Sequence, residues 1–347
     1  MKNESLLSKI KRVFNGIEED VDPNASFLKK LYILIDVSIE RLLFGTYFLD
    51  YVQYDFYGKK RRERNKYVVF GKLLEIIRVC NDKDKKIIFD HKPSFNKTFN
   101  NYINRDWIFT NESTYDEFKE FVKRNDVFFT KESDGMFGVG VNKYNRKDIT
   151  NLEILYDELK NKSAICEEYL TQCRELSEFN DTSINSLRVV TIRQANGDVN
   201  VIGGLLRIGR KGRIADNFHH MGICAYLDPD EGVVSTTGID KTYTRYVLHP
   251  DSKKQIVGFN VPIWEKVVET VKEAALVVPD VRYVGWDVVI TEDYRVVLVE
   301  GNPGADPDAE QITTKEGRWY KYKPLLDDIE KIKKENQWLV LWMIIVK

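Results

Sequence analysis

Asp287 and Glu300 have the residue types and the spacing of a metal site. They lie in two apolar, β-branched runs that flank a short polar turn, which is typical of a β-hairpin. A turn centred between Asp293 and Tyr294 places Asp287 opposite Glu300, and facing like charges are destabilising without a cation. Asn302 returns to the same face two residues later. We therefore predict a Mg2+ site formed by Asp287, Glu300 and Asn302. The alternative is a solvated hairpin end with two surface acids.

A lysine and a glycine-rich loop indicate a phosphate site. Lys131 ends an expected strand, Val127–Lys131, and leads into the loop. Backbone N–H groups of such a loop can bind phosphate oxygens while a lysine neutralises their charge, although the same glycines also suit an ordinary β-hairpin. The glycines are Gly135, Gly138 and Gly140.

A second expected strand, Ala164–Glu167, has the character of a hinge between two lobes. Its edge, continued by the next three residues, can offer backbone donors and acceptors to an adenine ring. The predicted nucleotide contacts of this hinge are Glu167, Glu168, Tyr169 and Leu170.

Two arginines are expected to converge on one face of a second hairpin. Asn196-Gly197 is a strong two-residue turn signal, and it pairs Arg188 with Leu205. Arg207 lies two residues further on and therefore on the same face as Arg188. Planar guanidinium groups suit phosphate or carboxylate oxygens. The alternative is a solvated sheet face that carries two surface arginines.

A polar loop, residues 209–222, follows this hairpin and holds His219 and His220. Neither histidine has a Cys or His partner at zinc spacing. We expect these histidines to contact substrate or to make local hydrogen bonds rather than to bind a metal ion.

The registers of the two hairpins must position all of these side chains. The first register also pairs Thr291 with Val296, and the second also pairs Arg193 with Asn200. A slip by one residue would turn every side chain of a strand to the opposite face, so the site depends on both registers.

Two helices are expected beside the strands. An apolar stripe predicts a helix from Pro262 to Val278, with Pro262 in its first turn. Another helix, Tyr115–Arg124, would follow a cap at Asn111 or Ser113. Residues 1 to about 60 also have helical periodicity and form an expected appended region.

Length and composition favour a soluble enzyme. The chain has 347 residues, of which 43% are hydrophobic and 31% are charged. Its net charge is -1, and neither half of the sequence is strongly basic. This excludes a nucleic-acid footprint and leaves small anionic substrates open. The length suggests two or three lobes around one site.

The N-terminus shows no signal-peptide pattern, and four cysteines without CxxC spacing favour a reducing cytoplasm. The last apolar run, Trp338–Val346, is nine residues long, short of the roughly 20 that a membrane-spanning helix needs. It could form a packed terminal element or a membrane-surface foot, so peripheral membrane contact stays open. The cysteines are Cys80, Cys166, Cys173 and Cys224.

In their order along the chain, these features resemble those of ATP-grasp enzymes. In the D-alanine–D-alanine ligase branch a first phosphate lysine, which Lys92 resembles, precedes a second, which Lys131 matches. Asp287, Glu300 and Asn302 match the metal ligands of that family. The resemblance implies an α+β fold in which two lobes clamp the cofactors ATP and Mg2+.

The sequence is still more similar to the sugar-transfer-associated ATP-grasp group of bacterial surface polysaccharide synthesis. The similar segments are Asn185–Thr191, Leu205–Gly209, Asp216-Asn217 and Gly285–Asp287. The resemblance covers about residues 85–325 and implies two lobes, which we place at 65–165 and 166–347, after the helical region that the periodicity indicates at 1–64. The implied substrate contacts are Asn185, Asp216, Asn217, His219 and His220.

The chain departs from the family pattern at two positions of the site. Gly285 stands where the ligase branch carries an arginine two residues before the first metal acid, and Arg188 would supply that charge. The ribose-binding glutamate falls on Arg174, so that Glu175, one residue later, is the candidate. Residues 1–60 have no counterpart in the family.

The resemblance implies an ATP-dependent carboxylate–amine ligase that acts through an acyl phosphate and produces ADP. Arg188 and Arg207 would stabilise the acyl phosphate and then the tetrahedral oxyanion. The expected substrates are a sugar acid, such as a uronic acid, and an amino compound, in capsule or other surface polysaccharide biosynthesis. The alternative is a kinase that phosphorylates a sugar-related hydroxyl with the same ATP and metal groups.

Overall fold

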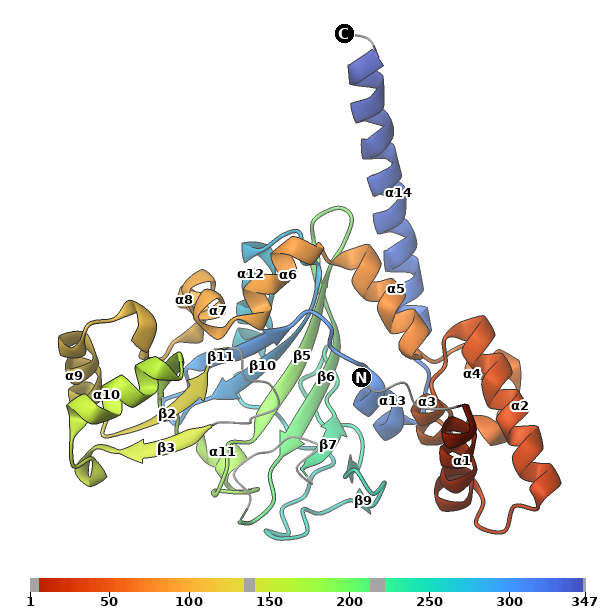
Figure 1. The fold of residues 1–347 in the computed structure, drawn as a ribbon, viewed down its shortest axis with the longest axis horizontal. Coiled ribbons are helices and arrows are strands. Elements are labelled where there is room, and N and C mark those ends of the chain that lie inside the picture. The colour runs from red at the N-terminus through yellow and green to blue at the C-terminus, as the bar shows by residue number, and fades with distance from the viewer. Residues whose placement is uncertain (1–5, 134–140, 213–221, 346–347) are drawn as a thin grey trace. The chain divides into compact units, whose positions relative to one another are not determined.

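The computed structural model describes residues 6–133, 141–212 and 222–345, which divide into two compact units (Figure 1). The helical unit comprises residues 1–80, 194–196 and 306–347, and the α+β unit comprises residues 81–193 and 197–305. Residues 65–80 and 306–347, which the family resemblance assigns to the two lobes, thus belong to the helical unit.

The α+β unit is built on two antiparallel sheets (Figure 1). The small sheet has the order β1-β4-β2-β3 and the large sheet the order β11-β10-β5-β6-β7-β8-β9. The strands of the small sheet are β1 (Trp107–Phe109), β2 (Val127–Glu132), β3 (Asn142–Asn145) and β4 (Ala164–Glu168). Those of the large sheet are β5 (Ser186–Arg193), β6 (Val199–Ile208), β7 (Ile223–Tyr226), β8 (Gly238–Ile239), β9 (Arg245–Tyr246), β10 (Tyr283–Ile290) and β11 (Val296–Asn302).

Helices cover one face of each sheet. On the small sheet, Phe118 of α9 and Tyr156 of α10 share a core with Phe128 of β2. On the large sheet, Val267 of α12 packs in a larger core with Trp286 of β10. The helices of this unit are α6 (Lys83–Asp90), α7 (Lys92–Thr98), α8 (Asn100–Ile103), α9 (Tyr115–Arg124), α10 (Leu152–Asn161), α11 (Arg174–Ser177) and α12 (Trp264–Val277), with 3-10 turns η3 (Thr110–Glu112) and η4 (Arg146–Asp148).

Two of the expected helix starts are wrong. Helix α12 begins at Trp264 because Ile263, just before it, has a left-handed φ of 48°, so Pro262 lies outside the first turn. Helix α9 is capped by Thr114, whose hydroxyl accepts from the N–H of Glu117 in a capping box, rather than by Asn111 or Ser113.

Each of the two hairpins contains a β-bulge that the sequence did not indicate. In the first, the loop is three residues long, Tyr294 adopts a left-handed φ of 57°, and Ile290 pairs with Val296 where we expected Thr291. The extra residue Val299 then forms a bulge that restores the expected pairing of Asp287 with Glu300.

The second hairpin behaves in the same way. Arg193 pairs with Val199 instead of Asn200, and a bulge at Ile202 restores the expected pairing of Arg188 with Leu205. The predicted neighbours near both turns were therefore wrong, whereas the pairings at the functional ends of the strands are confirmed.

The helical unit is built mainly from an N-terminal and a C-terminal segment of the chain. The amide of Gln311 accepts from the N–H of Val68 at 2.8 Å and donates to the carbonyl of Val68 and to the hydroxyl of Tyr54. In the described residues, no helix is both long and apolar enough to cross a membrane. The elements are α1 (Leu6–Gly16), the π-helix η1 (Ile17–Val21), α2 (Phe27–Phe44), α3 (Phe48–Gln53), η2 (Phe56–Gly58), α4 (Arg61–Arg64), α5 (Phe70–Cys80), α13 (Asp308–Thr314) and α14 (Trp319–Ile345).

Candidate active site

A row of charged side chains crosses three neighbouring strands of the large sheet. Glu300 of β11 pairs with Asp287 of β10, and Asp287 pairs on its other side with Arg188 of β5. Asn302, two residues after Glu300, pairs with Gly285 and returns to the same face. The register thus brings together two carboxylates, one amide and one guanidinium at the end of the hairpin.

Two arginines bind Asp287. Arg188 donates from Nε to one carboxylate oxygen at 2.5 Å and from Nη2 to the other at 3.1 Å. Arg207 of β6 reaches across β5 and donates from Nη1 to both oxygens, at 3.2 and 3.1 Å. The two arginines therefore share a face, and they converge on the acid rather than on open solvent.

The two acids of the row have opposite pKa shifts. Burial favours the neutral form of Asp287, but the charges of Arg188 and Arg207 outweigh it and hold the pKa of Asp287 below its usual value. Loss of hydration and then the charge of Asp287 raise the pKa of Glu300, although Lys131 and Arg188 act in the other direction. A cation between the acids would relieve this repulsion, so the donor set fits Mg2+.

Among the residues described, no group of three or more His, Cys, Asp or Glu side chains is placed to hold a metal ion. The candidate site agrees with this finding because it offers two carboxylates and the amide oxygen of Asn302, which accepts from the N–H of Gly304 at 2.8 Å. Water and substrate phosphates commonly complete the coordination of Mg2+ in such sites.

Gly285 makes room for Arg188. A Cβ at position 285 would lie 2.5 Å from the Cβ of Ala305 and 3.0 Å from the Cδ of Arg188. Both distances are shorter than van der Waals contact, so a larger residue would displace the arginine. This packing supports the expectation that Arg188 supplies the charge that the ligase branch carries at position 285.

A second cluster of charges lies on the face of the small sheet opposite its helices. Lys131 of β2 donates to Glu167 of β4 at 2.7 Å, and Arg105 binds the other carboxylate oxygen at 2.5 Å. Burial acts to raise the pKa of Glu167, but Arg105 and Lys131 together lower the pKa well below its usual range. Glu167 is therefore charged near neutral pH, and its carboxylate orients the Lys131 ammonium.

Arg105 connects this cluster to the β10–β11 hairpin, and no sequence pattern indicated this role. Its Nη1 donates to the carbonyl of Leu298 at 2.7 Å and its Nη2 donates to the carbonyl of Val299 at 3.3 Å. Val299 is the bulge residue that brings Glu300 into register with Asp287. One buried guanidinium thus contacts both the bulge beside Asp287 and Glu300 and the carboxylate that binds Lys131.

The proposed first phosphate lysine lies beside the end of β2. Lys92 begins α7, and its backbone N–H donates to the carbonyl of Ser133 at 3.3 Å. Ser133 follows Lys131 by two residues. The two lysines therefore come from neighbouring backbone segments.

The residues after Glu167 are largely engaged within the small sheet. Glu168 accepts from the N–H of Asp106 at 2.9 Å. Tyr169 donates its N–H to the carbonyl of Val127 at 3.4 Å, and the ammonium of Lys143 lies 4.0 Å from its ring centroid. Leu170 is half-buried.

Two other predicted contacts have structural partners. Glu175 accepts a hydrogen bond of 2.8 Å from the hydroxyl of Tyr294, which lies in the turn between β10 and β11. Asn185 is fully buried, and its amide binds Gln172, the carbonyl of Leu176 and the N–H of Gly209. The amide of Asn185 therefore holds the end of β6 in place, and its contact with a substrate stays a prediction.

Several predicted site residues lie outside the residues that the structure describes. They are Gly135, Gly138, Gly140, Asp216, Asn217, His219 and His220.

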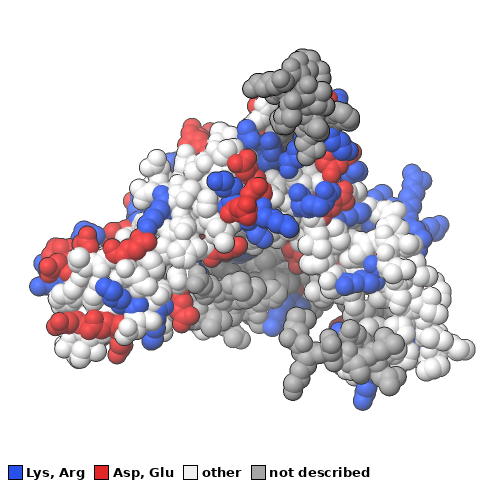
Figure 2. Space-filling view, turned by 45° about the horizontal axis from the view of Figure 1, so that its top comes forward, with Lys and Arg blue, Asp and Glu red and all other residues white. Residues whose placement is uncertain are grey.

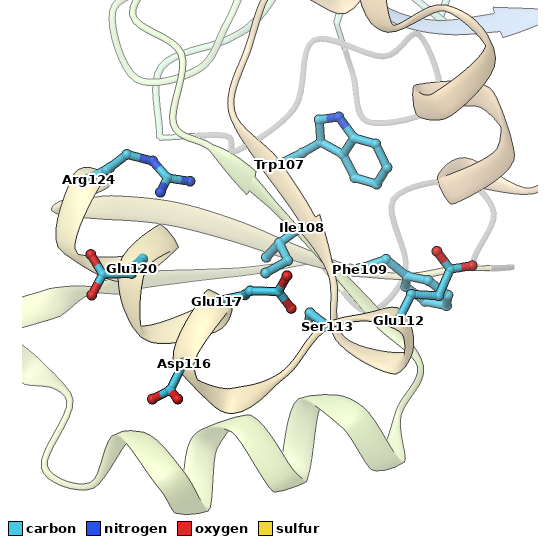
Figure 3. A pocket seen from close by; sticks show the side chains of 9 residues that line it. All are labelled: Trp107, Ile108, Phe109, Glu112, Ser113, Asp116, Glu117, Glu120 and Arg124. Atoms are coloured by element: carbon cyan, nitrogen blue, oxygen red, sulfur yellow. The ribbon is translucent and has the colours of Figure 1, made fainter.

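A pocket of about 460 Å3 lies elsewhere, along β1 and α9 (Figure 3). It contains none of the predicted site residues. The side chains around it include Glu112, Asp116, Glu117 and Glu120, and their negative charge makes it unsuitable for the phosphates of a nucleotide.

Comparison with known proteins connects this geometry to a family. Residues 74–323 match the model of the family described as sugar-transfer associated ATP-grasp. The chain belongs to this family. Membership confirms the expected ATP-grasp fold. None of the curated proteins compared with the chain matches it significantly.

Solved structures resemble this ATP-grasp chain only distantly. The ATP-grasp ligase PsnB complexed with a minimal precursor is 15% identical, with 68% of this chain and 64% of that chain covered and a TM-score of 0.40. PsnB complexed with minimal precursor, Mg and ADP is 17% identical, with coverages of 79% and 69% and a TM-score of 0.43. The D-alanine-D-alanine ligase from Coxiella burnetii is 7% identical, with coverages of 76% and 64% and a TM-score of 0.45. The chain therefore spans less than two thirds of the first and third of these proteins.

Proposed function

We propose that this ATP-grasp enzyme is an ATP-dependent carboxylate–amine ligase that acts through an acyl phosphate and produces ADP. The observation that carries the proposal is the row of Glu300, Asp287 and Arg188, with Arg207 bound to the same Asp287. Two acids at one end suit a divalent cation, and two guanidinium groups at the other suit the oxygens of an anion. The family relationship supports ATP as the phosphoryl donor.

Asp287, Glu300 and Asn302 would hold Mg2+, which when bound would neutralise phosphate charge during phosphoryl transfer. Lys131 would contribute a second positive charge to the phosphates, because Glu167, which also binds Arg105, holds the ammonium at the end of β2. The three metal ligands and Lys131 lie on strands rather than in loops, which limits their motion and favours a fixed geometry.

The arginines would act on the acceptor. Arg188 uses Nε and Nη2 to bind Asp287, and among the described contacts its Nη1 has no hydrogen-bond partner. That N–H group could donate to an oxygen of the acyl phosphate and then to the tetrahedral oxyanion. Asp287 fixes the orientation of the guanidinium before substrate binds, so little reorganisation is needed.

For the substrates, we propose a sugar acid such as a uronic acid and an amino compound, joined in the cytoplasm during surface polysaccharide synthesis. The sugar-transfer association of the family supports a sugar-related acceptor. The small sheet and the large sheet would form the first and second ATP-grasp lobes.

ADP release by the purified protein tests the proposal. We expect ADP to form from ATP and Mg2+ when a pool of uronic acids and a pool of amines are both present, and to decrease strongly when either pool is omitted. ADP formed with a sugar in the absence of amine, together with a product heavier by one phosphoryl group, would instead identify a kinase.

A further inference from the structure

Helix α2 of the helical unit exposes a broad apolar face. Leu28, Ile35 and Leu42 recur every seven residues, and their exposed fractions are 75%, 52% and 87%. The α2 face consists of Phe27, Leu28, Leu31, Tyr32, Ile35, Ile39, Leu42 and Leu43. At 3.6 residues per turn these side chains span an arc of about 160°, which contains no charged residue. The surface of the N-terminal helices, at the right of Figure 2, is correspondingly mainly white.

The opposite side of α2 packs in the core of the helical unit. Ile33 and Val37 are buried there, and Arg64 binds Asp36 at 2.8 Å and Glu40 at 3.2 Å. These contacts fix the rotation of α2 and leave the α2 face directed outwards. A contiguous exposed apolar patch of this kind marks an interaction site, because isolated soluble proteins rarely expose one.

Both edges of the α2 face carry a cation stacked on a tyrosine. The ammonium of Lys29 lies 5.1 Å from the ring centroid of Tyr57 and also forms an ion pair with Asp22, and the guanidinium of Arg41 lies 3.6 Å from the ring centroid of Tyr47. On the helix these two cations lie about 120° to either side of the centre of the face. The basic run 59–62 begins two residues after Tyr57.

We propose that the α2 face docks on the surface of an anionic lipid bilayer, with α2 lying in the plane of the interface. Tyrosine and cations at the edges of an apolar face match the boundary between acyl chains and negative headgroups. An interface between two packed helices would use a narrow apolar stripe with charged pairs on both sides. On α2 the apolar surface is wider, because Tyr32 and Ile39 extend it beyond the stripe of residues spaced by seven. The lipid surface therefore fits better than a second copy of the chain.

Flotation with lipid vesicles tests this docking without any dependence on ATP or on the proposed reaction. We expect the full chain to float with vesicles that contain phosphatidylglycerol. Leu28→Glu, Ile35→Glu and Leu42→Glu combined should lower the bound fraction at least tenfold. The control combines Ile87→Glu, Ile154→Glu and Leu276→Glu, which remove apolar side chains that are also more than half exposed from the α+β unit and should leave binding unchanged.

A second measurement avoids any dependence on a triple variant. All four native cysteines are buried, so Ile35→Cys would provide a selective attachment point for an environment-sensitive dye. We expect a blue shift of its emission on addition of anionic vesicles. The same dye on Ile154→Cys should show none.

The dependence of vesicle binding on lipid charge distinguishes recognition of anionic lipid from nonspecific hydrophobic adsorption. Lys60→Ser and Arg62→Ser together should weaken binding to anionic vesicles, by about fivefold for each cation, and have little effect with neutral phosphatidylcholine. Absence of vesicle binding by the wild type, or full binding by the folded triple variant, would overturn the proposal. A dimer in sedimentation that the triple variant dissociates, without vesicle binding, would assign the face to a second copy.

Discussion

Replacing Arg105 by methionine tests whether one buried arginine holds the candidate site together. Methionine preserves much of the side-chain length but removes the charge and the donors to the carbonyls of Leu298 and Val299. Glu167 would then keep Lys131 as its charged partner in a buried position. The variant removes one of the two cationic partners of Glu167 and the donor to two backbone carbonyls, so we expect the free energy of unfolding at pH 7 to fall by about 1–3 kcal/mol.

Two further variants show whether the loss comes from the buried charge. Arg105→Met combined with Glu167→Gln removes both partners, and it should be less destabilised than the sum of the single variants by at least about 1 kcal/mol. Arg124→Met is the matched control, because its ion pair with Asp106 is exposed and should contribute less than about 1 kcal/mol.

The pH dependence of unfolding provides an independent check. The pKa of Glu167 is lowered in the folded state, so its stabilisation is present above the usual value of 4.5 and is lost as the pH falls through the folded value. The difference between wild type and Arg105→Met should therefore shrink below about pH 4.5 in urea unfolding series. A loss below 1 kcal/mol at pH 7, or additive effects in the double variant, would refute the reasoning.

Three further substitutions test individual parts of the site. Glu300→Gln should lower ATP turnover at least about 100-fold without unfolding the protein, and near-normal ADP release would remove the metal assignment. Lys131→Ala should weaken ATP binding about tenfold in calorimetry, whereas Lys119→Ala on the exposed side of α9 should not, and equal affinities would place the phosphates elsewhere. Gly285→Ala should destabilise by about 1–3 kcal/mol because its methyl group would meet another side chain at 2.5 Å, while Gly58→Ala, with nothing within 4 Å, should be tolerated.

The facing acids were predictable because alternation along a strand is robust at the end far from the turn. The hairpin loop is one residue shorter than expected, and the bulge at Val299 compensates for this difference. No pattern in the local sequence signals this bulge, whose carbonyl accepts a hydrogen bond from the distant Arg105. The predicted pairing of Asp287 with Glu300 is therefore confirmed, but it depends on a bulge that the prediction did not include.

The role of Arg105 could not be predicted, because its partners are distant in the sequence. It binds the carbonyls of Leu298 and Val299, 193 and 194 residues away, and backbone groups carry no sequence signature. Asn185 is the opposite case, in which a motif was recognised but the position of the side chain in the fold was not predicted. Its motif indicated a substrate contact, but the amide is fully buried among backbone groups.

Trapping with hydroxylamine tests the central claim, acyl-phosphate chemistry at the Arg188 end of the row, most directly. With ATP, Mg2+ and the acceptor acid identified by ADP release, the wild type should form a hydroxamate. Arg188→Ala should suppress this trapping far more than it weakens ATP binding. A phosphorylated product that forms without amine and does not react with hydroxylamine would contradict the account and identify a kinase.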